Sequence, residues 1–119
     1  MPKWVLIVED DSAVLEVLET MLSERYKVIT ATNGKEAVNN YRMFKPDIVL
    51  MDIMMPVMDG IEATKEIKSK YPNAKIIGVT AFASQKGKEI LEAGALEIIE
   101  KPFTKKKLIE TIEKYLMNE

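Results

Sequence analysis

The sequence predicts an α/β domain in which helices cover both faces of a parallel β-sheet. Short apolar runs alternate with amphipathic segments five times along the 119 residues. Several of the runs are apolar and β-branched at successive positions, which is typical of strands buried on both faces. Because the connections are short, we expect parallel strands joined by right-handed crossovers. Residues 1–119 are predicted to form one domain.

The apolar runs are the predicted strands. In chain order they are Trp4–Val8, Lys27–Ala31, Asp47–Met51, Lys75–Val79 and Leu96–Ile99. Asp52 follows the third run, and a proline and an Asp-Gly turn then lead the chain away before a helix begins. A carboxylate at the tip of a buried strand loses hydration, so we expect a metal, a lysine or a chemical role to compensate it.

The amphipathic segments between the runs are the predicted helices. In chain order they are Ser12–Ser23, Lys35–Phe44, Ile61–Tyr71, Ser84–Ala93 and Lys105–Met117. The first is expected to be capped by Asp11 or Ser12. Its predicted buried face consists of Val14, Val17, Leu18, Met21 and Leu22.

The last two helices differ in the strength of their patterns. The Ser84–Ala93 segment contains Gly87 and few apolar residues, which makes it the weakest prediction. The last helix has Thr104 as its expected N-cap. Its predicted buried face consists of Leu108, Ile112, Tyr115 and Leu116.

Composition excludes several kinds of chemistry and partner. Hydrophobic residues make up 47% and charged residues 30% of the chain, and the net charge is −2, so neither nucleic acid nor an anionic membrane is an expected partner. Without cysteine or histidine, disulfides, thiolate metal sites and histidine catalysis are excluded. No stretch approaches the ~20 apolar residues of a membrane span, and no signal peptide is recognisable. We expect a cytoplasmic protein.

Unusual polar residues follow four of the five predicted strands. They are Glu9, Asp10, Asp52, Thr80 and Lys101. The carboxyl ends of parallel strands meet at one edge of the sheet, where open α/β folds bind ligands. Three carboxylates there repel one another by ~1 kcal/mol per pair in water and by more where water is excluded. Oxygen ligands without histidine or cysteine select a hard ion, so we expect Mg²⁺.

This set of groups suits phosphoryl transfer. The cation and Lys101 would neutralise the phosphoryl oxygens while the Asp52 carboxylate attacks in line. The Thr80 hydroxyl can donate a hydrogen bond to an anionic oxygen. The product would be an aspartyl phosphate, which places ~1.5 to 2 additional negative charges at one point.

Five short motifs stand out in the sequence, and four of them contain these polar residues. They are Val8-Glu9-Asp10, Asp52 with Met55-Pro56 and Met58-Asp59-Gly60, Val79-Thr80-Ala81, Ala93-Gly94-Ala95 and Lys101-Pro102-Phe103. In this order and spacing, the whole chain resembles the receiver domain of bacterial and archaeal two-component response regulators. The resemblance implies a doubly wound, flavodoxin-like sheet with strand order 2-1-3-4-5 and five helices. It also implies a cis bond between Lys101 and Pro102.

The resemblance also assigns roles to the polar residues. Asp52 matches the phospho-acceptor, which takes a phosphoryl group from the phosphohistidine of a sensor histidine kinase or phosphotransfer protein. Glu9, Asp10, Asp52 and the backbone carbonyl of Met54 match the Mg²⁺ ligands. Thr80 matches the switch hydroxyl, and Lys101 matches the lysine that contacts the phosphoryl group. Such a protein is not an enzyme with a separate substrate, since it catalyses only its own phosphorylation and dephosphorylation at Asp52.

Three positions depart from the family pattern. Ile98 stands where many receivers carry a Tyr or Phe that turns inward on activation, so we expect a smaller response or one carried by the Ser84–Ala93 helix. Met54 and Phe82 occupy positions that tune dephosphorylation, and both are apolar. A long-lived phosphoaspartate is therefore predicted.

Other functions remain open at this stage. A degenerate receiver that acts only as a protein-binding module is the main alternative, although the complete set of polar residues argues against it. A hydrolytic phosphatase with an aspartyl phosphate would need a second acid two residues after Asp52, where Met54 stands. A flavin-binding protein would need a phosphate-binding loop after Val8, and the sequence has none there.

Overall fold

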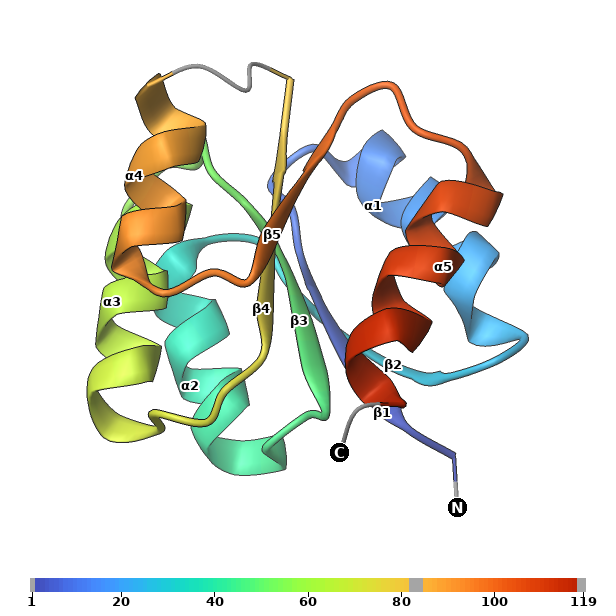
Figure 1. Cartoon of the computed structure of the whole chain (residues 1–119), viewed down its shortest axis with the longest axis horizontal. Coiled ribbons are helices and arrows are strands. Elements are labelled where there is room, and N and C mark those ends of the chain that lie inside the picture. The colour runs from blue at the N-terminus through green and yellow to red at the C-terminus, as the bar shows by residue number, and fades with distance from the viewer. Residues whose placement is uncertain (1, 82–84, 118–119) are drawn as a thin grey trace.

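The computed structural model describes residues 2–81 and 85–117. In this part of the chain, five parallel strands form one sheet in the order β2-β1-β3-β4-β5 (Figure 1). The strands are β1 (Trp4–Val8), β2 (Lys27–Ala31), β3 (Ile48–Asp52), β4 (Ile76–Thr80) and β5 (Glu97–Glu100). The fold class and the strand order predicted from the sequence are confirmed.

Five helices cover the sheet. They are α1 (Ser12–Ser23), α2 (Gly34–Phe44), α3 (Gly60–Lys70), α4 (Gln85–Ala93) and α5 (Lys105–Leu116). Helices α1 and α5 lie on one face, and α2, α3 and α4 lie on the other (Figure 1). The predicted start of the fourth helix, Ser84, lies outside the described residues. Among these helices, none has the length and apolar character to cross a membrane.

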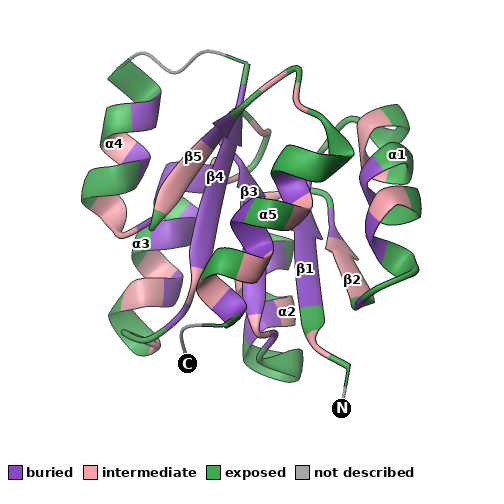
Figure 2. Ribbon diagram, turned by 45° about the vertical axis from the view of Figure 1, so that its right-hand side comes forward, coloured by how far each residue is buried: buried purple, intermediate pink, exposed green. Residues whose placement is uncertain are grey.

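Side-chain alternation along the central strands produces two cores. In β1, Val5 and Ile7 pack toward the α1–α5 layer, whereas Leu6 and Val8 pack toward α2, α3 and α4. Strand β3 divides in the same way, and all its residues are buried (Figure 2). This double burial is the physical reason for the continuous apolar runs in the sequence.

Strands β3, β4 and β5 begin one residue later than predicted, and β3 and β4 include the polar residue that follows each apolar run. Asp52 pairs with Val79, and Thr80 pairs with Glu100 in the parallel ladders. Backbone pairing does not depend on side-chain polarity. A strand predicted from apolar residues alone therefore ends one residue too early. As a result, Asp52 and Thr80 are held by strand hydrogen bonding rather than by flexible loops.

One residue of the predicted buried face of α1 is exposed in the structure. Leu18 and Leu22 are buried as expected, and Val14 and Met21 pack against the core, but Val17 is 52% exposed. Successive helical residues are about 100° apart, so Val17 lies at the side of a stripe centred on Leu18. The helix is capped by Asp11, whose side chain accepts hydrogen bonds from the first turn.

Helix α5 matches its prediction more closely. Thr104 caps it by accepting a hydrogen bond from the Lys107 backbone N–H at 3.0 Å. Leu108, Ile112 and Leu116 are buried, whereas Tyr115 is only partly buried, and its hydroxyl donates to Glu97 Oε1 at 2.7 Å. The helix ends at Leu116, one residue before the predicted end.

Candidate functional site

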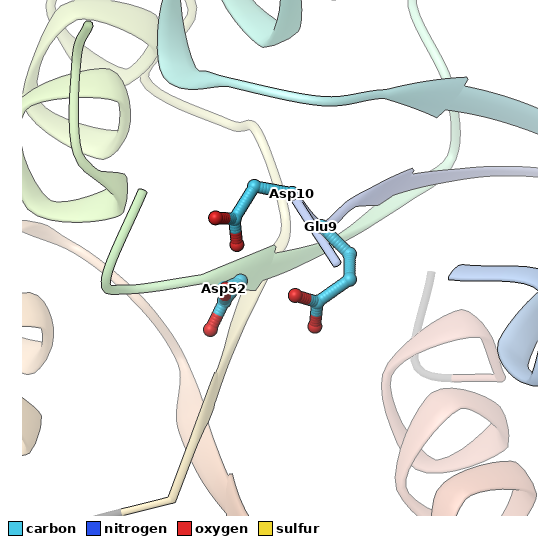
Figure 3. Close-up of side chains that lie close together, drawn as sticks. All are labelled: Glu9, Asp10 and Asp52. Carbon is cyan, nitrogen blue, oxygen red and sulfur yellow. The ribbon is translucent and has the colours of Figure 1, made fainter. Parts of the chain in front are cut away.

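Acidic side chains from two neighbouring strands meet at the carboxyl edge of the sheet (Figure 3). Glu9 and Asp10 follow β1, and Asp52 ends β3. Each offers a carboxylate oxygen, and the three oxygens lie within 4.8 Å of one another. The β1–β3 pairing fixes this approach, since Val8 is directly opposite Met51. The predicted acidic cluster is therefore present.

Lys101 reaches the same cluster from the end of β5. Its backbone N–H donates to the Thr80 carbonyl at 2.8 Å, which extends the β4–β5 ladder by one bond. Its Nζ lies 2.8 Å from Glu9 Oε1 and 3.7 Å from Asp52 Oδ1. The Lys101-Pro102 peptide is cis, as the resemblance implied. Lysine therefore pairs more closely with Glu9 than with Asp52, which sequence reasoning did not predict.

The site is largely buried. Glu9 is 2%, Asp52 7% and Thr80 3% exposed, whereas Asp10 and the Met54 side chain are exposed. Thr80 ends β4 at the same edge as the carboxylates. A buried carboxylate such as Glu9 requires a cation, and Lys101 supplies it at 2.8 Å.

Burial and neighbouring charge change the acidity of the site. Burial, followed by the negative charge of Glu9, raises the pKa of Asp52 to about 7, even though Lys101 partly offsets both effects. Burial lowers the pKa of Lys101, but its hydrogen bond to Glu9 and the charge of Asp52 outweigh that effect and raise it. Lys101 therefore stays protonated, while one lysine leaves three carboxylates incompletely neutralised.

The residues fit a hard divalent cation. The clustered donors are carboxylate oxygens, two of the three carboxylates are almost fully buried, and one ammonium cannot balance them. Oxygen-only sites of this kind suit Mg²⁺. Met54 lies in the bend directly after β3, two residues beyond Asp52, and its side chain is exposed.

Ile98 occupies the space beneath α4. It packs against the α2–α3–α4 core, and a Cβ added to Gly87 would lie 2.9 Å from its Cδ1 atom. The side chain on β5 and the glycine on α4 are thus matched in size. Phe82, the other position that departs from the family pattern near β4, lies outside the described residues.

Comparison with known proteins agrees with this geometry. Residues 5–113 match the response regulator receiver domain family. The chain belongs to this family. It is 45% identical over 117 residues to the chemotaxis protein CheY of Thermotoga maritima, covering 96% of this chain and 98% of that protein. It is 38% identical over 120 residues to the polar-differentiation response regulator DivK of Brucella anthropi, covering 98% of both.

Solved receiver structures share the fold over nearly the whole chain. The receiver domain of the sensor histidine kinase PA1611 from Pseudomonas aeruginosa has a TM-score of 0.92 and 32% identity, covering 98% of this chain and 99% of that one; its structure holds a magnesium ion in the active site cleft. CheY of Borrelia burgdorferi, solved with CheX, BeF3 and Mg, has a TM-score of 0.89 and 34% identity, with coverages of 96% and 89%. This protein is a CheY-like receiver, and receivers are signalling modules rather than enzymes in the ordinary sense.

Proposed function

We propose that this receiver is a phospho-acceptor in a two-component phosphorelay and that Asp52 is the phosphorylated residue. The observation that carries the proposal is the position of the Asp52 carboxylate. It lies almost fully buried at a strand end, beside two other carboxylates and 3.7 Å from the Lys101 ammonium. A binding module would have no use for such a concentration of like charge, which lowers folding stability.

The side chains divide the work of phosphoryl transfer. An Asp52 carboxylate oxygen attacks the phosphorus of a phosphohistidine in line, the O–P bond forms, and the N–P bond breaks as the imidazole leaves. Lys101 balances charge on the phosphoryl oxygens, and the Thr80 hydroxyl donates to one of them. Glu9, Asp10, Asp52 and the Met54 carbonyl would hold Mg²⁺, which when bound supplies further charge neutralisation.

The proposed donor is a sensor histidine kinase or a phosphotransfer protein, and the proposed location is the cytoplasm. The chain contains no histidine, so the phosphohistidine belongs to the partner. The net charge of −2 gives no support for a nucleic-acid partner. We propose that α4 and β5 carry the response, because the Gly87–Ile98 contact joins them where an aromatic residue stands in many receivers.

Phosphorylation is expected to require a divalent cation. Incubation with acetyl phosphate and Mg²⁺ should add one phosphoryl group per chain, measured by intact-protein mass spectrometry. The same incubation with excess chelator should add essentially none, because the carboxylates then repel the incoming anion. Equal labelling with and without Mg²⁺ would contradict the proposal. No labelling under either condition would favour the degenerate binding module.

The phosphoaspartate is expected to be long-lived. The exposed Met54 side chain cannot hydrogen-bond and orient an attacking water. Met54→Asn should shorten the half-life by about tenfold, because a positioned water reacts faster. The measurement is loss of phosphate after the phosphodonor is removed. Met54→Leu is the control and should keep the long half-life. Fast loss from the unmodified protein, unchanged by Met54→Asn, would disprove the prediction.

A further inference from the structure

The loop between β3 and α3, residues 53–59, contains a strained turn. The Met58 backbone N–H donates to the Pro56 carbonyl at 2.8 Å, which closes a three-residue turn around Val57. Val57 has a φ of 70°, in the left-handed region that β-branched residues rarely adopt. Its side chain is 80% exposed, so packing of that side chain does not impose the conformation. Contacts made by the neighbouring backbone must hold the turn.

Two glycines hold this loop from outside the turn. The Gly60 N–H donates to the Ile53 carbonyl at 2.9 Å and closes the base of the loop. The Gly34 N–H, at the start of α2, donates to the Met58 carbonyl at 2.8 Å. A Cβ on Gly34 would lie 2.4 Å from that carbonyl oxygen, and one on Gly60 would lie 2.1 Å from the Asp52 carbonyl oxygen. A side chain at either position must therefore displace backbone.

The geometry points to Gly34 as a positioning residue for the metal site: through Met58 it holds the strained turn at Val57, and the turn fixes the Met54 backbone beside Asp52. This inference rests on the proposed function, in which the Met54 carbonyl is a ligand. The atoms nearest to a Cβ built on Gly34 all belong to Met58. Gly34 acts from α2, a helix that contributes no residue to the proposed ligand set, and partners of ligands commonly tune metal affinity in this way.

Local helix stability does not explain the presence of glycine at this position. Alanine is a better helix former than glycine by up to ~1 kcal/mol, and Gly34 is not among the residues with positive φ. The close approach to the Met58 carbonyl is the feature that excludes a side chain. Gly34→Ala should therefore act on the loop rather than on α2.

Mg²⁺ affinity, measured by isothermal titration calorimetry with MgCl₂, tests the inference. Gly34→Ala should weaken binding about tenfold, and labelling by acetyl phosphate should recover at saturating Mg²⁺. Gly87→Ala is the matched control. It also adds a methyl group to a helical glycine, but its contact is the flexible end of Ile98, and its Mg²⁺ affinity should equal that of the unmodified protein.

A second pair of variants avoids the helix altogether. Val57→Pro cannot adopt a φ of 70°, whereas Val57→Gly can, and neither change removes a buried side chain, since Val57 is 80% exposed. Val57→Gly should bind Mg²⁺ about tenfold more tightly than Val57→Pro. Equal Mg²⁺ affinities in this pair, together with unchanged affinity in Gly34→Ala, would overturn this inference but not the proposed function. Absence of Mg²⁺ binding in the unmodified protein would overturn the proposed function as well.

Discussion

Replacing Asp52 by asparagine is expected to abolish phosphorylation. The amide is neutral and is not a competent nucleophile, and no other carboxylate of the cluster occupies the same strand-end position. Glu9 is already paired with Lys101 at 2.8 Å, and Asp10 is exposed. Labelling by acetyl phosphate and Mg²⁺ should fall on the order of 10³-fold or more, measured as the initial rate of phosphoryl incorporation.

Asp47→Asn is the matched control for this experiment. Asp47 immediately precedes β3, at the opposite end of the strand from Asp52, and its carboxylate accepts a hydrogen bond from the Trp4 N–H at 2.7 Å. An asparagine oxygen can accept the same bond. The control therefore makes the same change in charge on the same strand and should label normally. Equal loss in both variants would show a general effect of charge or folding and would contradict the assignment.

The second large effect concerns stability without metal. Asp52→Asn should make the metal-free protein more stable above neutral pH, by on the order of 2 kcal/mol in the free energy of unfolding. Burial and the charge of Glu9 raise the pKa of Asp52 from 3.8 to about 7 in the folded state. Ionising Asp52 therefore costs free energy in the folded state. Asparagine cannot ionise, so the variant avoids that cost.

The sign of the pH dependence follows from the same shift. Below the unfolded pKa near 4, Asp52 is protonated in both states and costs nothing. Between about pH 4 and about pH 7 the unfolded chain has lost this proton while the folded protein still holds it, so stability falls as pH rises across this window and levels off above the folded pKa. The raised pKa of Lys101 acts above this window, since lysine titrates near 10.4.

Urea unfolding in chelator at about pH 5.5 and about pH 8.5 measures this difference. The unmodified protein should lose more stability between the two pH values than Asp52→Asn does, and Mg²⁺ should restore stability to the unmodified protein but not to Asp52→Asn. Asp47→Asn should follow the unmodified protein. Parallel pH dependences in the presence of chelator for all three proteins would contradict the account of the electrostatics.

The sequence predicts much of this molecule because apolar runs and strand ends carry strong physical signals. Asp52 and Thr80 stand out since a polar residue directly after a buried run must lie at the sheet edge. The pattern could not place them inside the strands, because the ladder hydrogen bonds that include them do not depend on side-chain type. The Glu9–Lys101 pair was also missed, because spacing along the chain does not show which of three carboxylates the lysine approaches.

The role of Gly34 shows a different limit. In the sequence, Gly34 is a single glycine that directly precedes a helical pattern, and no residue near it indicates a contact with Met58. Only the packing of α2 against the loop after β3 gives it a function. Val17 shows the same limit on a smaller scale, since its exposure depends on how α1 is rotated against the sheet.

Identification of the modified residue is the sharpest test of Asp52 as the phospho-acceptor. After labelling with acetyl phosphate and Mg²⁺, borohydride reduces an aspartyl phosphate to homoserine, and tandem mass spectrometry of the peptides locates it. We expect homoserine at position 52 and unchanged aspartate at positions 10, 11, 47 and 59. Homoserine at another aspartate, or a phosphoryl group that resists borohydride because it is held on a hydroxyl, would contradict the claim that Asp52 is the phospho-acceptor.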